Sequence, residues 1–336
     1  MAISVTELPA RLGEIFYTVI LPMLLLSGIG FVIRRFLGLD MPTLTRLNFY
    51  FVTPGMVYFS VVSAKLTAGE VGLIIAASLV TMALVAAVTI LVARLEKVPR
   101  DQHNAMLMTT VLNNSGNIGL PLQDLAFRGM GLGAAAMSYQ VFAMLVQNVS
   151  HFTLGVVLAA GKAQRPWKEN LLHVAKFPPL YALAVALITV FVRNQLGEHA
   201  PAAAKALAPF WEVVNQLRLA YVPVALVALG AQLALIPHGA DHYPVPTSLI
   251  LRLVVSPLLM LALIYALNIH GFLAQVLLIG SAAPSSVNSA LLCSQFDNHP
   301  NYVAKTVFYS TLLSAVTMTL VIFLAQGGFL KQLALN

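Results

Sequence analysis

Long apolar stretches separated by short polar breaks run along the whole chain, and this pattern predicts membrane-spanning helices. Charge-free runs cover residues 15–33, 71–93, 130–161, 271–296 and 306–330. Each run is near or above the roughly 18–20 residues that a helix needs to cross the hydrocarbon core. Breaks at charges and at Gly, Pro and Asn clusters divide the chain into ten spans, at about residues 14–35, 45–64, 70–93, 103–127, 131–159, 177–196, 212–236, 246–268, 271–296 and 303–328.

The composition excludes a soluble globular domain. Of the 336 residues, 59% are hydrophobic and 9% are charged, whereas roughly a quarter of the residues in a soluble domain are charged. The formal net charge of +7 comes from basic residues scattered through short loops, so it indicates membrane topology and not a nucleic-acid partner. We therefore expect an all-α polytopic membrane protein in contact with the lipid bilayer.

Lysine and arginine are unequally divided between the two sides of the predicted bundle. Loops after odd-numbered spans carry eleven of them, the opposite side with both termini carries six, and Arg218 and Arg252 lie inside spans. Because cytoplasmic loops carry the excess of basic residues, both termini are expected on the outer side. Arg252, near the start of its span, is interpreted as an interfacial anchor.

A weak internal repeat divides the chain into two halves. "LNFYFVTP" at residues 47–54 resembles "LRLAYVP" at 217–223, and "FVIRRFLG" at 31–38 resembles "FVRNQLG" at 191–197. Five is an odd number of spans, so a second copy of five must be inverted relative to the first, as in many secondary transporters. We expect one repeat at residues 1–160, a cytoplasmic connector at 161–176 and the inverted repeat at 177–336.

Two polar interruptions fall at matching positions of these halves, in spans 4 and 9. They read "NNSGNIGLP" at residues 113–121 and "APSSVNSAL" at 283–291. Such breaks predict discontinuous helices that cross at the bilayer midplane, where the restarted half-helices present their positive N-terminal ends to an anion. The predicted substrate-binding residues are Asn113, Asn114, Asn117, Pro121, Pro284, Ser285, Ser286 and Asn288. A kink that only aids packing, or a neutral polar ligand, stays an alternative.

Other polar residues are candidates for the cavity or its gate. Asp124 either forms an ion pair with Arg128 near the surface or belongs to a proton-linked gate, and Gln140 either bonds neighbouring helices or contacts substrate. The remaining candidates either face the cavity or pack against other helices, namely Tyr50, Arg218, Tyr221 and Tyr309. No metal-ligand spacing, phosphate-binding loop or nucleophile–base pair is recognised, so neither an enzyme nor a cofactor is expected.

The motifs "NNSGNIGLPL", "PSSVNSALLCSQFDNHP" and "VFYSTLLSAVTMTL" are similar to those of bacterial members of the auxin efflux carrier family. The resemblance implies the crossed-helix inverted-repeat plan that bile acid:sodium symporters share. It implies a scaffold of spans 1, 2, 6 and 7, a transport unit of spans 3–5 and 8–10, and a carboxylate-binding asparagine at Asn114. The short connector between spans 5 and 6, and Phe177-Pro178-Pro179 where many members have Asn-Pro, make auxin itself a poor substrate prediction.

The function expected from these patterns is that of a carrier in the plasma (inner) membrane of a bacterium, moving a small organic anion by alternating access, with proton or sodium as a coupling ion. One alternative is a sodium-coupled symporter of the bile-acid type, which would need a carboxylate near the crossing. None occurs within residues 104–123 or 271–296. A second alternative is a non-transporting sensor, which would usually carry a soluble module. Substrate, direction, coupling ion and oligomeric state, a homodimer included, stay open.

Overall fold

The computed structural model describes residues 8–161, 177–196, 205–235 and 243–327, and the regular structure in these ranges is helical throughout. Seven of the described helical segments are long and apolar enough to cross a membrane, at Leu8–Leu37, Ala68–Leu95, Gly133–Ala160, Pro178–Leu196, Ala208–Leu233, Val245–Ala266 and Pro300–Gln326. The prediction of an all-α, multi-pass membrane protein is therefore confirmed. The expected spans at residues 45–64, 103–127 and 271–296 are not among these seven.

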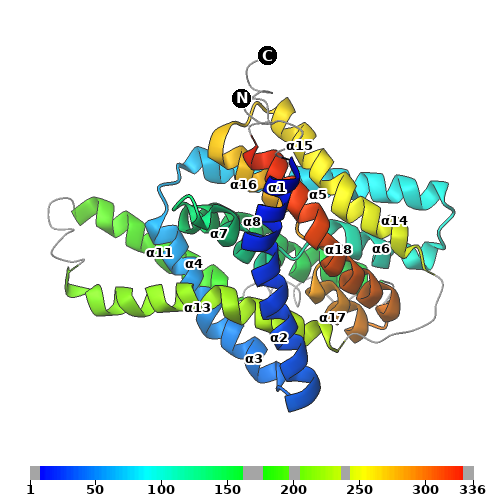
Figure 1. Ribbon diagram of the computed structural model, residues 1–336, viewed down its shortest axis with the longest axis horizontal. Coiled ribbons are helices and arrows are strands. Elements are labelled where there is room, and N and C mark those ends of the chain that lie inside the picture. The colour runs from blue at the N-terminus through cyan, green and yellow to red at the C-terminus, as the bar shows by residue number, and fades with distance from the viewer. Residues whose placement is uncertain (1–7, 162–176, 197–204, 236–242, 328–336) are drawn as a thin grey trace.

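Figure 1 shows the described α-helices in chain order. Those of the first half are α1 (Leu8–Ile15), α2 (Leu21–Leu37), α3 (Met41–Leu47), α4 (Thr53–Ser63), α5 (Ala68–Leu95), α6 (His103–Val111), α7 (Leu120–Arg128), α8 (Gly133–Ser150) and α9 (Val156–Ala160). Those of the second half are α11 (Pro178–Leu196), α13 (Ala208–Leu233), α14 (Val245–Ile250), α15 (Ser256–Ala266), α16 (Gly271–Ser281), α17 (Val287–Gln295) and α18 (Pro300–Gln326). The predicted connector at residues 161–176 lies, except for Gly161, outside the described residues.

Short π-helical turns join several of these helices. They are η1 (Phe16–Ile20), η2 (Asn48–Val52), η4 (Ser115–Gly119), η5 (His151–Gly155) and η7 (Leu251–Val255), while η3 (Arg100–Gln102) is a 3-10 turn. Four of the π-helical turns end two residues before a proline, at Pro22, Pro54, Pro121 and Pro257. A proline ring clashes with the carbonyl four residues earlier and has no N–H to donate to it. The wider π turn gives that carbonyl room without ending the helix.

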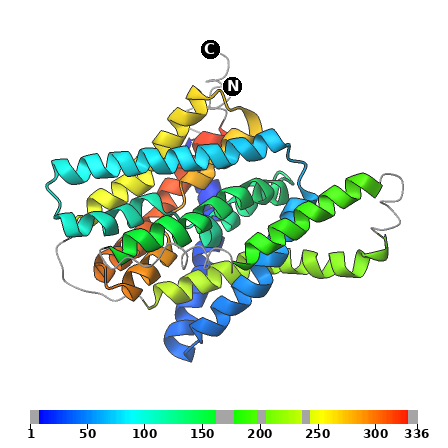
Figure 2. The ribbon, with the colours of Figure 1, turned by 180° about the vertical axis from the view of Figure 1, so that it is seen from behind.

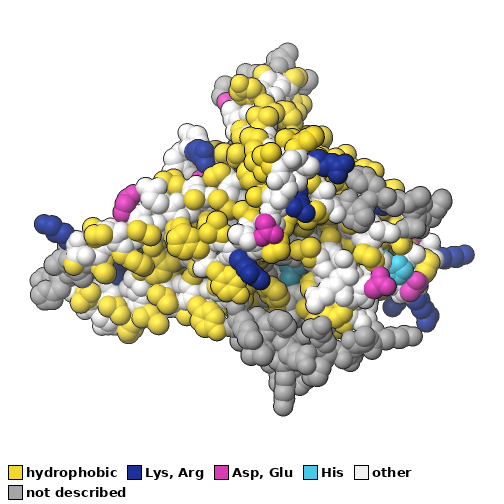
Figure 3. Space-filling model, turned by 90° about the horizontal axis from the view of Figure 1, so that it is seen from below, with side chains coloured by type: hydrophobic (Ala, Val, Ile, Leu, Met, Phe, Trp, Pro, Cys, Tyr) yellow, Lys and Arg dark blue, Asp and Glu magenta, His cyan; other side chains and the backbone are white. Residues whose placement is uncertain are grey.

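The outer surface is apolar. Phe36, Leu37, Ile188, Phe191 and Val316 are each more than half exposed, and Figure 3 shows apolar side chains over most of one face, with only scattered charged ones. In water such a surface would aggregate, whereas lipid chains solvate it. The exposed apolar residues therefore fit the membrane assignment.

Two groups of helices can be described, which contact each other through α4 and α8 and through α13 and η4. In one, α13 packs against α2 and α4, and α11 packs against α4; the α11–α13 pair projects to one side of the molecule (Figures 1 and 2). In the other, α5 packs against α6, α8 and α15, and α16 packs against α18 and α8. The segments from α6 to α7 and from α16 to α17 belong to the second group, and both are interrupted in the middle.

Candidate functional site

The two interruptions lie in contact. Asn113 and Ser285 form an antiparallel bridge. The N–H of Asn114 donates to the carbonyl of Pro284 at 2.8 Å, and the N–H of Ser286 donates to the carbonyl of Leu112 at 3.0 Å. Backbone groups at membrane depth must find partners inside the protein, and each break here satisfies the other. The two breaks form one structural unit.

Side-chain caps restart the helices after each break. Asn114 Oδ1 accepts from the N–H of Asn117 at 3.2 Å and caps η4, which continues into α7. Pro121 lies in the second turn of this restarted helix, just after the π turn that accommodates it. In the second break, Ser286 Oγ accepts from the N–H of Asn288 at 3.2 Å. Both caps occupy free N–H groups at a helix start. The serine cap in the second break is of the kind that its sequence predicts, whereas in the first break Asn114 is the cap and Asn117 is the donor.

A small polar cavity of about 30 Å³, which we term the asparagine cavity, lies beside the breaks. Five of the predicted substrate-binding residues line it: Asn113, Asn114, Asn117, Ser286 and Asn288. Further asparagines, Asn48 of η2 and Asn148 of α8, complete a ring of six. Carboxamides supply both donors and acceptors, so the cavity suits a polar ligand.

The side-chain amide of Asn114 is the distinctive donor of this cavity. Its Oδ1 is taken by the Asn117 N–H, which fixes the orientation of the carboxamide, and its Nδ2 has no partner. The residue is 5% exposed. Leaving a buried polar group unpaired costs about 1–3 kcal/mol, so this N–H₂ is set to donate to a ligand or to water. Asn113 Oδ1 is unpartnered in the same way.

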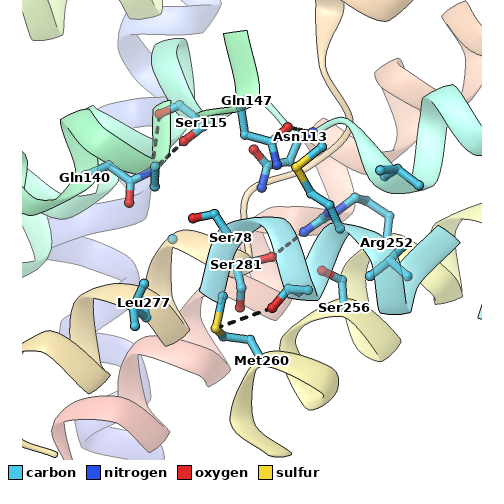
Figure 4. Close-up of a pocket in the computed structure, with 16 residues that line it drawn as sticks. Ser78, Asn113, Ser115, Gln140, Gln147, Arg252, Ser256, Met260, Leu277 and Ser281 are labelled. Atoms are coloured by element: carbon cyan, nitrogen blue, oxygen red, sulfur yellow. Dashed lines mark hydrogen bonds between the residues drawn. The ribbon is translucent and has the colours of Figure 1, made fainter. Parts of the chain in front are cut away.

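A second cavity, the arginine cavity, shares Asn113, Ser115 and Gln147 with the first and is shown in Figure 4. It has a volume of about 40 Å³, and its lining includes Asn113, Ser115, Gln147, Arg252 and Ser281. Arg252 is 2% exposed, so its interpretation as an interfacial anchor is wrong. The sequence shows that a charged residue lies in this span, but it does not show which face of the helix carries that residue. A lone arginine several residues into an apolar span is itself a signal of a functional site.

Gln140 of α8 bonds to the first broken helix, in agreement with the interpretation that it bonds neighbouring helices. Its Nε2 donates to Ser115 Oγ at 2.7 Å, and its Oε1 accepts from Gln123 Nε2 at 3.3 Å. Gln123 also donates to the carbonyl of Val276 at 2.8 Å. The carboxamide of Gln140 therefore joins α8 with the first break, and through Gln123 with α16.

Three further candidate site residues lie close to the breaks or within α7. Tyr221 is 1% exposed and borders the asparagine cavity from α13. Pro284 is buried at its break. Asp124 forms an ion pair with Arg128 one turn further along α7, with side-chain exposures of 9% and 60%, which is the first of its two interpretations.

Three other candidates border neither cavity. Tyr50 is 69% exposed and Tyr309 is 47% exposed, and both sit among surface residues. Arg218 lies over the ring of Phe59, 4.9 Å from its centroid, and donates to Asn215 Oδ1 at 3.5 Å. Sequence periodicity could not distinguish these residues from Tyr221. Packing determines how each helix is rotated about its axis, and therefore which side chains face the cavity.

The lining of a third cavity helps to identify which cavity binds the ligand. A larger cavity of about 240 Å³ lies between α2, α13 and α18, with a lining that includes Ile20, Phe31, Leu226 and Met318, and an apolar lining does not favour a charged ligand. Within the described ranges, no group of three or more His, Cys, Asp or Glu residues could hold a metal ion. The asparagine cavity is therefore the best-supported ligand site.

Comparison with known proteins places the chain among transporters. A family model described as Membrane transport protein matches residues 15–322. The chain is 26% identical over 311 residues to an uncharacterized transporter of Methanothermobacter thermautotrophicus, over 90% of this chain and 95% of that protein. It is 25% identical over 224 residues to an uncharacterized transporter of Methanocaldococcus jannaschii, over 67% and 69%. It is 28% identical over 225 residues to a putative malonate transporter of Rhizobium meliloti, over 64% and 66%.

Proposed function

The chain belongs to the membrane transport protein family, the auxin efflux carrier family, and from this premise we propose that it is a secondary carrier for a small organic anion. The observation that carries the proposal is the buried side-chain amide of Asn114, a residue that lines the asparagine cavity and whose Nδ2 has no hydrogen-bond partner. A carboxylate oxygen accepts from such a donor, and hydrogen bonds to charged groups are the stronger ones.

The architecture we propose has ten spans in two inverted repeats. The segment from α3 to α4 is span 2, and the interrupted segments from α6 to α7 and from α16 to α17 are spans 4 and 9, which cross at the midplane. Both termini lie outside the cell. The contact between Asn113 and Ser285 supports the crossing, and matched breaks in two halves are typical of inverted-repeat carriers.

The two packing groups correspond, in this proposal, to a scaffold and a transport unit. The scaffold contains α2, α4, α11 and α13, and the transport unit contains the two broken helices with α5, α8, α15 and α18. Asn48 and Tyr221 border the asparagine cavity from the first group, whereas Asn114, Ser286 and Asn288 border it from the second. A site at the boundary between two groups opens when they move relative to each other, which is what alternating access requires.

The substrate class follows from the size and polarity of the site. A cavity of about 30 Å³ holds only a few water molecules, so a substrate enters when the groups separate. The relative from Rhizobium meliloti is named a putative malonate transporter, and this supports a small mono- or dicarboxylate. An inside-negative potential favours anion export by about 2.3 kcal/mol per charge per 100 mV.

Flux into sealed liposomes tests the proposal. Purified protein is reconstituted, and counterflow of labelled malonate and of small monocarboxylates is measured beside binding by calorimetry. We expect at least one carboxylate to be carried. Asn114→Ala should weaken its binding roughly 10–100-fold, because a hydrogen bond to a charged group contributes about 1.5–3 kcal/mol.

The matched control is Asn194→Ala, an exposed asparagine on α11. This control should bind and transport as the wild type does. If no carboxylate is carried, or if Asn114→Ala and Asn194→Ala behave alike, the proposed site is wrong.

A further inference from the structure

Arg252 places a positive charge inside a membrane-spanning segment. It lies in η7 and is 2% exposed. Its Nη1 donates to the carbonyl of Thr110 at 3.0 Å, and its Nη2 donates to the carbonyl of Ser281 (Figure 4). A buried ionised group is strongly destabilising unless an equal and opposite charge lies near it. The source of that negative charge therefore has to be identified.

No carboxylate supplies it within the described part of the chain. The ion pairs found there join Arg128 with Asp124 and His299 with Asp101, and the polar residues beside Arg252 in the arginine cavity are neutral. The partners of the guanidinium are instead two backbone carbonyls. It is the position of these carbonyls in their helices that explains the charge balance.

Both carbonyls lie at the C-terminal ends of interrupted helices. Thr110 is in the last turn of α6, and Ser281 is the last residue of α16. The C-terminus of a helix carries about half a negative elementary charge on its unpaired carbonyls. Two such ends together offset roughly one positive charge, which is the charge of one guanidinium. Arg252 thus neutralises the negative ends of both half-helices at once.

The same place has the ligands of a cation site. Carbonyls at half-helix C-termini and in unwound backbone coordinate Na⁺ in carriers with broken helices. The carbonyls of Thr110 and Ser281 both accept from the guanidinium, and Asn113, whose Oδ1 has no partner, lines the arginine cavity together with Ser281. Without the guanidinium, the two carbonyls would lie buried at negative helix ends with no positive charge beside them. The guanidinium supplies the positive charge that a bound metal cation would otherwise supply.

The arginine cavity does not suit a second substrate molecule. Nη1 and Nη2 of Arg252 already donate to the carbonyls of Thr110 and Ser281, so the guanidinium does not present its paired donors to a carboxylate. Arg252 Nε is buried and has no hydrogen-bond partner. The charge of Arg252 therefore acts on the helix ends and not on a bound anion.

We propose that Arg252 is a built-in counter-cation, which holds the carbonyl ends of α6 and α16 together and takes the place of a bound coupling cation. Its consequence for transport rests on the proposed function: the carrier needs no Na⁺ to keep the two breaks in contact. Its consequence for the fold does not rest on the proposed function, because the buried charge must be compensated whether or not a substrate is bound.

Thermal unfolding of the purified protein without substrate tests the inference. NaCl is exchanged for choline chloride at constant ionic strength, and methylguanidinium chloride is added in a separate titration. The wild-type midpoint should be the same in Na⁺ and choline. Arg252→Ala should unfold at a lower temperature and regain roughly 2–4 °C, in a saturable way, with Na⁺ or methylguanidinium. Choline, which is too large for the cavity, should not restore it.

Two further variants separate charge from packing. Arg252→Lys keeps the charge and should stay insensitive to the exchange of cations. Arg193→Ala is the matched control, because Arg193 also donates to a carbonyl, that of Val62 at 3.1 Å, but is exposed on α11. It should show no cation response.

The outcomes decide the inference in either direction. A cation response confined to Arg252→Ala supports it. A wild type that responds to Na⁺, or an Arg252→Ala that responds to no small cation, overturns it. Should Arg252→Ala fail to fold, Arg252→Gln replaces it, and equal damage in Arg252→Lys and Arg252→Gln overturns the inference. Because no substrate is present, absence of carboxylate flux would contradict the proposed function and leave this result standing.

Discussion

Gly280 leaves the space that the side-chain carboxamide of Gln140 occupies: a Cβ atom at Gly280 would lie 2.5 Å from Gln140 Oε1. Hydrogen bonds with Ser115 and Gln123 hold that carboxamide in place. It cannot swing away from a new methyl group without leaving buried polar atoms unpaired, which costs about 1–3 kcal/mol. The second broken helix therefore depends on a glycine for its contact with α8.

Gly280→Ala is expected to lower the free energy of unfolding by about 1–3 kcal/mol, measured by denaturant unfolding in detergent. Gly72→Ala is the control, because nothing lies within 4 Å of a Cβ atom at Gly72 in α5. That substitution should be neutral or stabilise the helix by up to about 1 kcal/mol. The double variant with Gln140→Ala should lose less than the two single losses added together, since it removes the clash. Equal stability of Gly280→Ala and Gly72→Ala would contradict the expectation.

The crossing of α2 and α13 also depends on glycines. A Cβ atom at Gly30 would overlap the carbonyl oxygen of Val227, and one at Gly230 would overlap the carbonyl oxygen of Ser27. These obstacles are backbone atoms, so the two helices would have to separate. Small residues allow such close approach in membranes.

We expect Gly30→Ala to destabilise the protein by about 1–3 kcal/mol or more, measured as a lower midpoint of thermal unfolding. Gly28→Ala, on the same helix with no atom within 4 Å of the added Cβ, should leave the midpoint unchanged or raise it. A Gly30→Ala variant as stable as Gly28→Ala would mean that the helices tolerate a wider separation than this contact suggests.

The breaks could be predicted from the sequence because their chemistry is local. Asparagine, serine, glycine and proline have poor helix propensity and cap new helices, so residues 113–121 and 283–291 stand out within apolar segments. The α-helical, multi-pass class follows from apolar length alone. Both features are set by neighbouring residues, and both are present in the described fold.

The direction of individual side chains could not be predicted in the same way. Tyr221 and Tyr50 are both tyrosines in apolar segments, yet one is 1% exposed and the other 69%. Arg252 lies against carbonyls of two helices that are distant in the sequence, Thr110 and Ser281. Such contacts depend on how each helix is rotated and tilted in the bundle, and a single sequence does not encode that in any local pattern.

Asp40 links pH to stability outside the spans. Its Oδ2 accepts from the N–H of Thr43 at 3.0 Å and caps α3, and hydrogen bonds from the side chain and backbone of Thr43 lower the pKa of Asp40 below 3.8. Since the folded-state pKa is the lower one, the carboxylate stabilises the fold above the unfolded-state pKa. This contribution is lost as the pH falls through the folded-state value.

Asp40→Asn tests this linkage, because asparagine also caps helices but carries no charge. Thermal unfolding midpoints of the variant and the wild type are compared from neutral pH downward. The wild type should unfold at the higher temperature near pH 7, and the difference should shrink as the pH falls below 3.8. A difference that stays constant with pH would show that the charge of Asp40 has no part in it.

Asn114→Asp separates the donor role of Asn114 from its capping role. The aspartate keeps an oxygen for the N–H of Asn117, which lies 3.2 Å from Asn114 Oδ1, so the restarted helix should remain. It replaces the unpartnered Nδ2 by a second oxygen and adds a negative charge. Two like charges 4 Å apart repel by about 4 kcal/mol at an effective dielectric constant of 20, which is roughly a 1000-fold loss of carboxylate affinity.

The order of affinities then identifies the role. If Asn114 donates to an anion, calorimetry should give wild type, Asn114→Ala and Asn114→Asp in order of decreasing affinity, with similar unfolding midpoints for wild type and Asn114→Asp. If Asn114 serves only as a cap, the isosteric Asn114→Asp should bind nearly as well as wild type, and Asn114→Ala should be the weakest. The two roles thus reverse the order of the two variants, so one binding series distinguishes them.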